Sequence, residues 1–199
     1  CISHMHADHV TGLAGMLMLS SQADREDPLY IYGPPKLQEY IAQNRKLLDM
    51  YINYEIVVRT VEEGVVHIGD GYRIEAFPLY HTKPCFGYSL IEDDRPGLFH
   101  PEKAIELGIP KGPLWSQLQS GSPVVLENGQ TVMPQQILGP PRSGRKFSYV
   151  TDSLAKPSIS RYVDQAYVFL CEGMFEHALL DSAIEKKHMT ALQAAQIAL

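Results

Sequence analysis

The sequence has few cysteines, and none of them are arranged as in metal sites or disulfide frameworks. Cys1, Cys85 and Cys171 are the three cysteines among 199 residues, and no two of them form a CxxC pair. Disulfide-stabilised small domains and thiolate zinc sites need paired or clustered cysteines. The pattern excludes both and favours a reducing compartment, so we expect the protein in the cytoplasm.

Long apolar runs and a basic excess are also missing. The apolar stretch from Leu13 to Leu19 is interrupted by Gly15, and it is far shorter than the roughly 18 residues of a membrane helix. We therefore expect no contact with a membrane. The formal net charge is −6, whereas proteins that bind nucleic acid usually carry a basic surface. Any nucleic-acid partner has to be reconciled with this acidic balance.

What the sequence does contain is an alternation of strand and helix patterns. Short runs of β-branched and aromatic residues predict strands, and an apolar periodicity after Pro34 predicts a helix. A capping box, Thr190-Ala-Leu-Gln193, predicts a second helix that runs to Leu199. We expect an α/β fold with strands at residues 28–33, 55–60, 64–68, 72–79, 86–91, 146–150 and 166–171.

Residues 97–146 have a different composition. They contain seven prolines, two short helix-like pieces and one hairpin signal, Asn128-Gly129. Five Lys and Arg against three Glu give this segment a net charge of +2, which leaves −8 for the rest of the chain. We expect an inserted arm with a weakly basic surface. An ordinary surface insertion with scattered charges remains the alternative.

The strongest signal is SHMHADH, which places His4, His6, Asp8 and His9 within six positions. Alternate residues point the same way in an extended segment, so His4 and His6 can face the same side, with Asp8 and His9 on the turn that follows. Imidazole and carboxylate suit zinc or a similar cation, and the lack of clustered cysteines favours a hydrolytic site over a structural one. Four ligand-type residues exceed the usual need of one catalytic zinc. Two adjacent metals, bridged by a carboxylate from elsewhere, would use all four.

SHMHADH followed by a Gly-rich helix resembles the signature of the metallo-β-lactamase fold, and further stretches resemble the ribonuclease Z family of tRNA 3′-processing endonucleases. The resemblance implies an αββα sandwich over residues 1–199, with residues 97–146 as its tRNA-binding arm. Thr151 and Ser153 depart from the Gly and Thr that usually flank the family's aspartate. The stretches are His81-Thr-Lys-Pro-Cys-Phe-Gly-Tyr88, Ile109-Pro-Lys-Gly-Pro113, Gly139-Pro-Pro-Arg-Ser-Gly-Arg-Lys146, Tyr149-Val-Thr-Asp-Ser153, Cys171-Glu-Gly-Met-Phe175 and Lys187-His-Met-Thr190.

The resemblance also implies a site with two zinc ions, in which Mn²⁺ or another divalent metal is possible. His4, His6 and His81 would hold one metal. Asp8 and His9 would hold the other, and Asp152 would bridge the two. The implied catalytic residues are Asp8 as proton acceptor and His188, oriented by Glu172, as proton donor or phosphate ligand.

The implied activity is removal of the 3′ trailer from precursor tRNA by two-metal phosphodiester hydrolysis, which leaves a 3′-hydroxyl on the tRNA. The implied partners are precursor tRNA and a second copy of the chain in a homodimer. The residues expected to bind the substrate are Lys111, Gly112, Pro113, Arg142, Arg145 and Lys146.

The family's first strands precede the motif, and its final metal-ligand histidine follows the last predicted helix. We therefore expect residues 1–199 to be a partial domain, incomplete at both ends. Two alternatives stay open. One is another hydrolase of the same fold, such as a phosphodiesterase, an arylsulfatase-like enzyme or a lactonase. The other is an inactive fragment.

Overall fold

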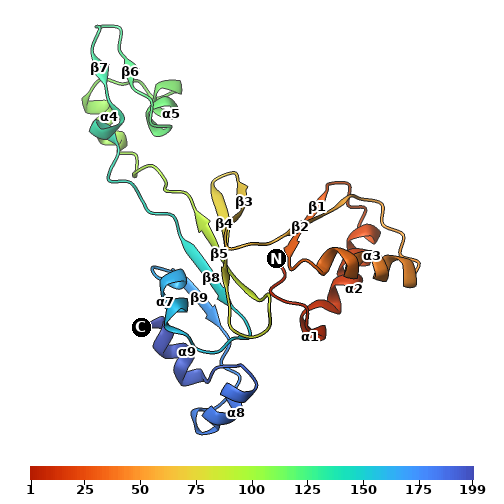
Figure 1. Cartoon of the computed structure of the whole chain (residues 1–199). Coiled ribbons are helices and arrows are strands. Elements are labelled where there is room, and N and C mark those ends of the chain that lie inside the picture. The colour runs from red at the N-terminus through yellow and green to blue at the C-terminus, as the bar shows by residue number, and fades with distance from the viewer. The chain divides into compact units, whose positions relative to one another are not determined.

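The computed structural model describes all residues from Cys1 to Leu199 and divides them into two compact units (Figure 1). The larger unit consists of Cys1–Ile91 and Lys146–Leu199, and the smaller one of Glu92–Arg145. The chain passes once from the larger unit into the smaller one and returns once. The larger unit therefore joins two segments that lie 54 residues apart in the sequence.

Helices and a small parallel sheet form the first half of the larger unit (Figure 1). The helices are α1 (Ala7–Val10), α2 (Gly12–Gln22) and α3 (Leu37–Leu47), and the strands are β1 (Leu29–Gly33) and β2 (Ile56–Thr60). The two strands pair in parallel. One face of the sheet packs against α2 and α3, because the apolar residues of these elements meet in one cluster. Its buried members are Leu13, Leu17, Ile31, Leu37, Ile41, Met50 and Tyr54.

A five-stranded sheet forms the second half, with the strand order β3-β4-β5-β8-β9. The strands are β3 (Gly64–Gly69), β4 (Tyr72–Pro78), β5 (Phe86–Glu92), β8 (Lys146–Val150) and β9 (Val168–Cys171). β5 and β8 are antiparallel, whereas β8 and β9 are parallel. The neighbouring strands β5 and β8 thus precede and follow the smaller unit in the sequence.

The two faces of the larger sheet pack against different layers. The helices α7 (Pro157–Val163) and α9 (Ala191–Ala198) cover one face (Figure 1), and Phe77 and Val150 are buried beneath them. The other face meets the small sheet, since Phe86 and Tyr88 of β5 lie in one cluster with Tyr32 of β1. The order of layers is helix, sheet, sheet, helix, which confirms the predicted αββα sandwich. The short helices η1 (His177–Leu179) and α8 (Leu180–Glu185) precede α9.

The smaller unit has its own core. Three short helices, α4 (Pro101–Glu106), α5 (Pro113–Gln119) and α6 (Pro134–Ile137), surround the two-residue strands β6 (Val124–Val125) and β7 (Thr131–Val132). Each helix has proline at its first or second position, where the missing N–H costs nothing. The predicted hairpin signal is confirmed, because Gly129 sits between β6 and β7 with φ +82°. The core residues are Ala104, Ile109, Leu118, Val124, Val132 and Ile137.

The bounds of the smaller unit differ from the predicted arm. It spans Glu92–Arg145 instead of 97–146, because Lys146 pairs with Ile91 in the large sheet. The change brings in Glu92, Asp93, Asp94 and Arg95 and removes Lys146, so five basic residues now face six acidic ones. The net charge is −1. The +2 predicted for residues 97–146 therefore does not hold for the whole unit, because the net charge depends on where the arm is cut.

Gly87 in β5 offers a sharp test of the packing against the helical layer. A Cβ atom there would lie 2.4 Å from Cε2 of Phe77 and 3.0 Å from the carbonyl oxygen of Tyr149. Phe77 is itself buried and stacked on Tyr162, so it has little room to move. We expect Gly87→Ala to lower the free energy of unfolding by about 1–3 kcal/mol through overpacking. Denaturant titration measures this loss.

The matched control is Gly15→Ala in α2. A Cβ at Gly15 meets no atom within 4 Å, and alanine is the better helix former, so this variant should gain up to about 1 kcal/mol. Opposite signs for the two substitutions support the packing described above. A Gly87→Ala variant as stable as the unmodified chain would contradict it.

Candidate metal centre

The N-terminal motif is tied to both sheets by backbone hydrogen bonds. The N–H of Ile2 donates to the carbonyl oxygen of Tyr32 in β1 at 2.7 Å, and the N–H of Phe86 in β5 donates to the carbonyl oxygen of Ser3 at 3.0 Å. His4 follows at once and is fully buried. The chain then turns into α1, which carries Asp8 in its first turn. The motif therefore lies between the sheets and opens into a helix at the site.

Four predicted ligands form one cluster. The ligand atoms of His4, His6, His81 and Asp152 all lie within 4.8 Å of one another. His81 follows β4, and Asp152 follows β8, so strand ends deliver both residues to the motif. Nδ1 of His6 lies 3.1 Å from Nε2 of His81. Ligands on a tetrahedral zinc with bonds of 2.0–2.1 Å are about 3.3 Å apart, so this spacing suits zinc.

Asp8 and His9 form a second cluster with the same aspartate. Nε2 of His9 lies 3.2 Å from Oδ2 of Asp152 and 3.4 Å from Oδ2 of Asp8. The second cluster has three ligand-type residues and the first has four. Asp152 belongs to both, which is the position predicted for a bridging carboxylate.

The buried nitrogen of His4 fits a metal ligand. Nδ1 of His4 lies 3.1 Å from Oγ of Ser3, whereas Nε2 is buried and has no hydrogen-bond partner. An unsatisfied buried polar atom is costly unless a further group binds it. Burial lowers the pKa of His4 to about 4, with a smaller contribution from His9. The imidazole is thus neutral at pH 7, and the neutral ring is the form that binds a metal.

Asp152 is ionised in this setting. Burial alone would raise the pKa of its carboxyl group, but the histidines around it, led by His9, bring the net pKa below the ordinary value. A carboxylate surrounded by imidazoles has the charge and the lone pairs that a divalent cation needs. The residues present therefore fit a centre of one or two zinc-like ions.

Glu172 and His188 form a pair beside the two clusters. Nδ1 of His188 lies 3.2 Å from Oε2 of Glu172, and the N–H of Ser153 donates to Oε1. Burial raises the pKa of Glu172, and the bonds from Ser153 and His188 oppose that rise. The ring of His188 lies 4.8 Å from the ring of His81. Glu172 holds one nitrogen of His188, so the other is left for a different partner.

Backbone contacts at the site escaped the sequence analysis. Ser153 was noted only as a departure from the family pattern, yet its N–H anchors Glu172. Nδ1 of His81 is bonded to the carbonyl oxygen of Lys187 at 2.9 Å. Peptide groups act in both contacts, and a peptide group leaves no mark in the sequence. Only the left-handed backbone of Lys187, at φ +59°, distinguishes one of these positions.

The residues expected to bind a substrate are divided between the two units. Lys111, Gly112 and Pro113 lie at the start of α5 in the smaller unit. Nε of Arg142 donates to the carbonyl oxygen of Pro96, and the N–H of Arg145 to the side chain of Glu92. Lys146 belongs to β8 of the larger unit, where its Nζ donates to the carbonyl oxygen of Asp164.

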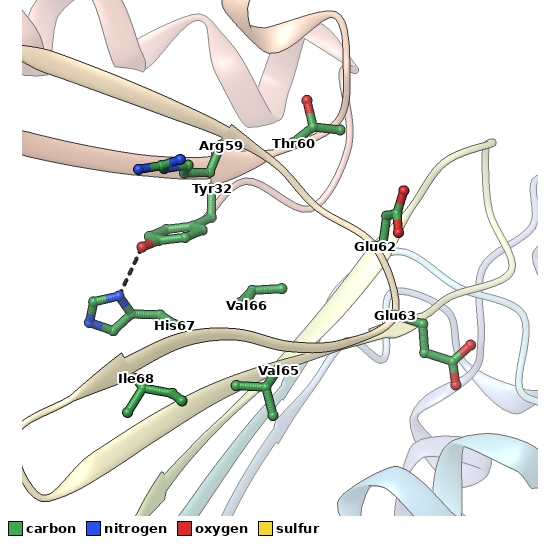
Figure 2. A pocket seen from close by; sticks show the side chains of 9 residues that line it. All are labelled: Tyr32, Arg59, Thr60, Glu62, Glu63, Val65, Val66, His67 and Ile68. Carbon is green, nitrogen blue, oxygen red and sulfur yellow. Dashed lines mark hydrogen bonds between the residues drawn. The ribbon is translucent and has the colours of Figure 1, made fainter.

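A cavity of about 530 Å³ lies apart from the metal ligands, and none of them lines it. Figure 2 shows that Tyr32 of β1 and His67 of β3 face each other across it, joined by a hydrogen bond of 2.8 Å. Tyr72 lies 3.4 Å from the other nitrogen of His67. His67 is therefore not a free surface side chain, because both ring nitrogens have a tyrosine partner. Its ring connects the two sheets, because a register shift in β3 between Val65 and His67 turns it toward β1.

Comparisons with known proteins agree with this geometry. Ribonuclease Z of Treponema denticola is 58% identical over 198 residues, which cover 99% of this chain and 64% of that protein. Ribonuclease Z of Borrelia recurrentis is 40% identical over 203 residues, with 99% of this chain and 63% of that protein covered. The chain thus spans less than two thirds of the length of the curated relatives it matches.

The fold has matches among solved structures. The crystal structure of human tRNase Z, short form, superimposes with a TM-score of 0.66 at 22% identity, covering 99% of this chain and 65% of that one. A family model described as "Beta-lactamase superfamily domain" matches residues 1–101. This match includes the motif, both strands of the small sheet and His81. Because it covers more than half of the 199 residues and the fold agrees, the chain belongs to the β-lactamase superfamily.

Proposed function

We propose that this chain carries the active centre of a zinc-dependent endoribonuclease that removes the 3′ trailer from precursor tRNA. The observation that carries the proposal is the meeting of both ligand clusters and the Glu172–His188 pair at Asp152. The similarity to curated ribonuclease Z over 99% of the chain supports the choice of substrate. In the proposed reaction, the oxygen of a water molecule attacks the phosphorus and the bond to the 3′ oxygen breaks. The products are a tRNA with a 3′-hydroxyl and a trailer with a 5′-phosphate.

Two zinc ions, or Mn²⁺ in their place, fit the two clusters. When bound, they would lower the pKa of a water molecule toward neutrality and stabilise negative charge on the phosphate oxygens. One ion would be held by the four-residue cluster and the other by the three-residue cluster. The proposed ligands are His4, His6, Asp8, His9, His81 and Asp152.

Asp8 and His188 are proposed to move the protons. The side chain of Asp8 is 77% exposed and adjoins His9, so its carboxylate can accept a proton from the attacking water and pass it to solvent. His188 is held through Nδ1 by Glu172, which leaves Nε2 for another partner. That nitrogen can give a proton to the leaving 3′ oxygen. The proposed base, Asp8, and the proposed acid, His188, then come from opposite ends of the chain.

The smaller unit is proposed to bind the tRNA through Lys111, Gly112, Pro113, Arg142 and Arg145, with Lys146 at its base. The sequence resemblance supports this role. Charge does not, because the unit has a net charge of −1. We therefore expect contacts that depend on shape and backbone geometry more than on the number of basic residues.

A homodimer in the cytoplasm completes the proposal. All three cysteines are free, which agrees with a reducing compartment. None of the helices combines the length and the apolar character that crossing a membrane requires. The oligomeric state is measured by light scattering coupled to gel filtration, where a mass of one chain would contradict the dimer.

Cleavage of a precursor tRNA with a labelled 3′ trailer tests the function. With zinc present, the chain should release a trailer with a 5′-phosphate. Asp8→Ala should lower the rate about a hundredfold, near the low end for loss of a general base. The effect is modest because bulk water can reach this exposed position and accept the proton instead. Single-turnover kinetics measure the loss, and gel-shift titration should show unchanged tRNA binding.

The control substrates are mature tRNA, which should stay intact, and a small chromogenic phosphodiester. Hydrolysis of the small diester without cleavage of precursor tRNA would replace the proposal with a general phosphodiesterase of the same fold. Zinc binding without any hydrolysis would indicate an inactive fragment. Full cleavage by Asp8→Ala would remove Asp8 from the mechanism.

A further inference from the structure

His81 uses its two ring nitrogens for different partners. Nε2 faces the cluster, 3.1 Å from His6 and 3.7 Å from Asp152, and Nδ1 lies 2.9 Å from the carbonyl oxygen of Lys187. A carbonyl oxygen can only accept a hydrogen bond, so Nδ1 must carry the ring proton. Nε2 then keeps its lone pair toward the cluster. A ring fixed in this way is presented to a metal in the tautomer that binds.

The carbonyl of Lys187 points to His81 because α8 ends in a left-handed turn. The N–H of His188 donates to the carbonyl oxygen of Ala183 at 2.8 Å, and the N–H of Lys187 to that of Ile184 at 3.1 Å. This pair of bonds, with φ +59° at Lys187, is a Schellman motif. The turned residue is usually glycine, since a Cβ atom is unfavourable there. The turn takes the carbonyl of Lys187 out of the helical direction.

The same turn positions the next residue. His188 follows Lys187 directly and meets Glu172 at 3.2 Å. One short segment therefore contacts a metal-ligating candidate through its backbone and supplies a proton donor through its side chain. The side chain of Lys187 is exposed, so the peptide group accounts for the contact.

We propose that Lys187 is a positioning residue for the metal centre, which acts through its peptide carbonyl on His81 and depends on the left-handed turn at the end of α8. The proposal rests on the metal centre of the proposed function. It adds a backbone element that ties His81 to the segment bearing His188. A change that opens the turn should weaken metal binding even though it removes no ligand.

Three variants of the whole chain test this. Lys187→Val disfavours the left-handed conformation, because a β-branched residue fits it poorly. Lys187→Gly removes the same charge and side chain but favours the turn. Asp24→Val is the matched control. Asp24 ends α2 in the same motif, exposed and with φ +52°, and the N–H groups of Asp24 and Arg25 donate to the carbonyl oxygens of Ser21 and Ser20.

Zinc affinity, measured by competition with a chromophoric chelator, is the deciding quantity. Lys187→Val should bind zinc about tenfold or more weakly, the usual effect of losing a group that orients a ligand. Lys187→Gly and Asp24→Val should stay within about twofold of the unmodified chain, again on the scale of that effect. Thermal unfolding without zinc should show similar losses of thermal stability for Lys187→Val and Asp24→Val. The loss of affinity is then separate from the loss of stability.

The other outcomes are equally clear. Equal affinity in Lys187→Val and Asp24→Val would overturn the positioning role. Weak binding by Lys187→Gly would overturn the assignment to the backbone and indicate the side chain. If Lys187→Val does not fold, imidazole ¹⁵N shifts of the unmodified zinc-free chain decide, because a neutral His81 ring with its proton on Nε2 instead of Nδ1 contradicts the proposal. An unmodified chain that binds no zinc would overturn the metal centre itself.

Discussion

Asp152→Ala is expected to abolish zinc binding at both clusters and to lower cleavage of precursor tRNA by about ten-thousandfold or more, which corresponds to roughly 5 kcal/mol of transition-state stabilisation. The reason is geometric. Asp152 belongs to each of the three groups of ligand-type residues at the site, and its Oδ2 lies within 3.8 Å of His4, His9 and His81. No other residue is shared by all three. Removing it leaves the four-residue cluster with imidazoles alone and the three-residue cluster with a single carboxylate, Asp8, to neutralise a divalent cation.

Metal content and zinc-dependent stability check this prediction. The unmodified chain should gain thermal stability when zinc is added, because a ligand that binds only the folded state stabilises it. Asp152→Ala should lose that gain. Asp70→Ala, in the exposed turn between β3 and β4, is the control and should keep both metal content and cleavage. Two tightly bound zinc ions in Asp152→Ala would contradict the bridging role.

The same aspartate shows how far local patterns predict the site. The motif could be found from sequence because its four ligand-type residues lie together in the chain. Asp152 is 143 residues from His9, and only its position after a buried strand and the family resemblance brought the two together. A strand end predicts which edge of the sheet a residue occupies. It does not predict the 3.2 Å that separates the two side chains.

Secondary structure was predictable where a pattern was strong. The seven predicted strands match β1, β2, β3, β4, β5, β8 and β9 with small shifts at their ends, and the capping box at Thr190 forms as expected. The helix α7 was not predicted. It has only seven residues, which is less than two turns. A helix that short is held by tertiary packing more than by its own sequence pattern.

Other parts of the site depend on contacts that no residue type announces. Lys187 and Ser153 act through peptide groups, which every residue has. His67 has one partner near in sequence, Tyr72, whereas its closer partner, Tyr32, comes from another sheet. The charge of the arm depends on a contact of the same kind. Lys146 pairs with Ile91 in the large sheet, and this pairing excludes Lys146 from the smaller unit.

The pair Glu172 and His188 carries the second large expected effect. His188→Ala should lower single-turnover cleavage about a thousandfold, within the range for loss of a general acid. Glu172→Gln should cost nearly as much. An amide can turn its NH₂ group toward Nδ1 of His188, which favours a proton on Nε2 in the resting state and removes the negative charge that stabilises the protonated ring. Both side chains are about nine-tenths buried, so water cannot easily replace either of them.

Controls separate this role from metal binding and from folding. Zinc affinity should be unchanged in His188→Ala, because neither of the two metal clusters contains His188. A clear loss of zinc would instead make His188 a ligand, since it also forms a group with Asp152 and Glu172. His177→Ala is the matched histidine variant. Its ring bonds to the hydroxyl of Thr190, and cleavage should stay close to that of the unmodified chain.

The double variant decides whether the two residues act as a unit. If Glu172 works only by orienting and stabilising His188, removing it costs nothing further once His188 is gone. The double variant should then cleave about as slowly as His188→Ala alone. Multiplied losses, near a millionfold on the same scale, would mean that Glu172 acts on the substrate or a metal independently. The N–H of Ser153 donates to Oε1 of Glu172, and this oxygen also lies 3.3 Å from Nδ1 of His188. In that case the hydrogen bond from Ser153 would position Glu172 for its own action as well as for holding His188.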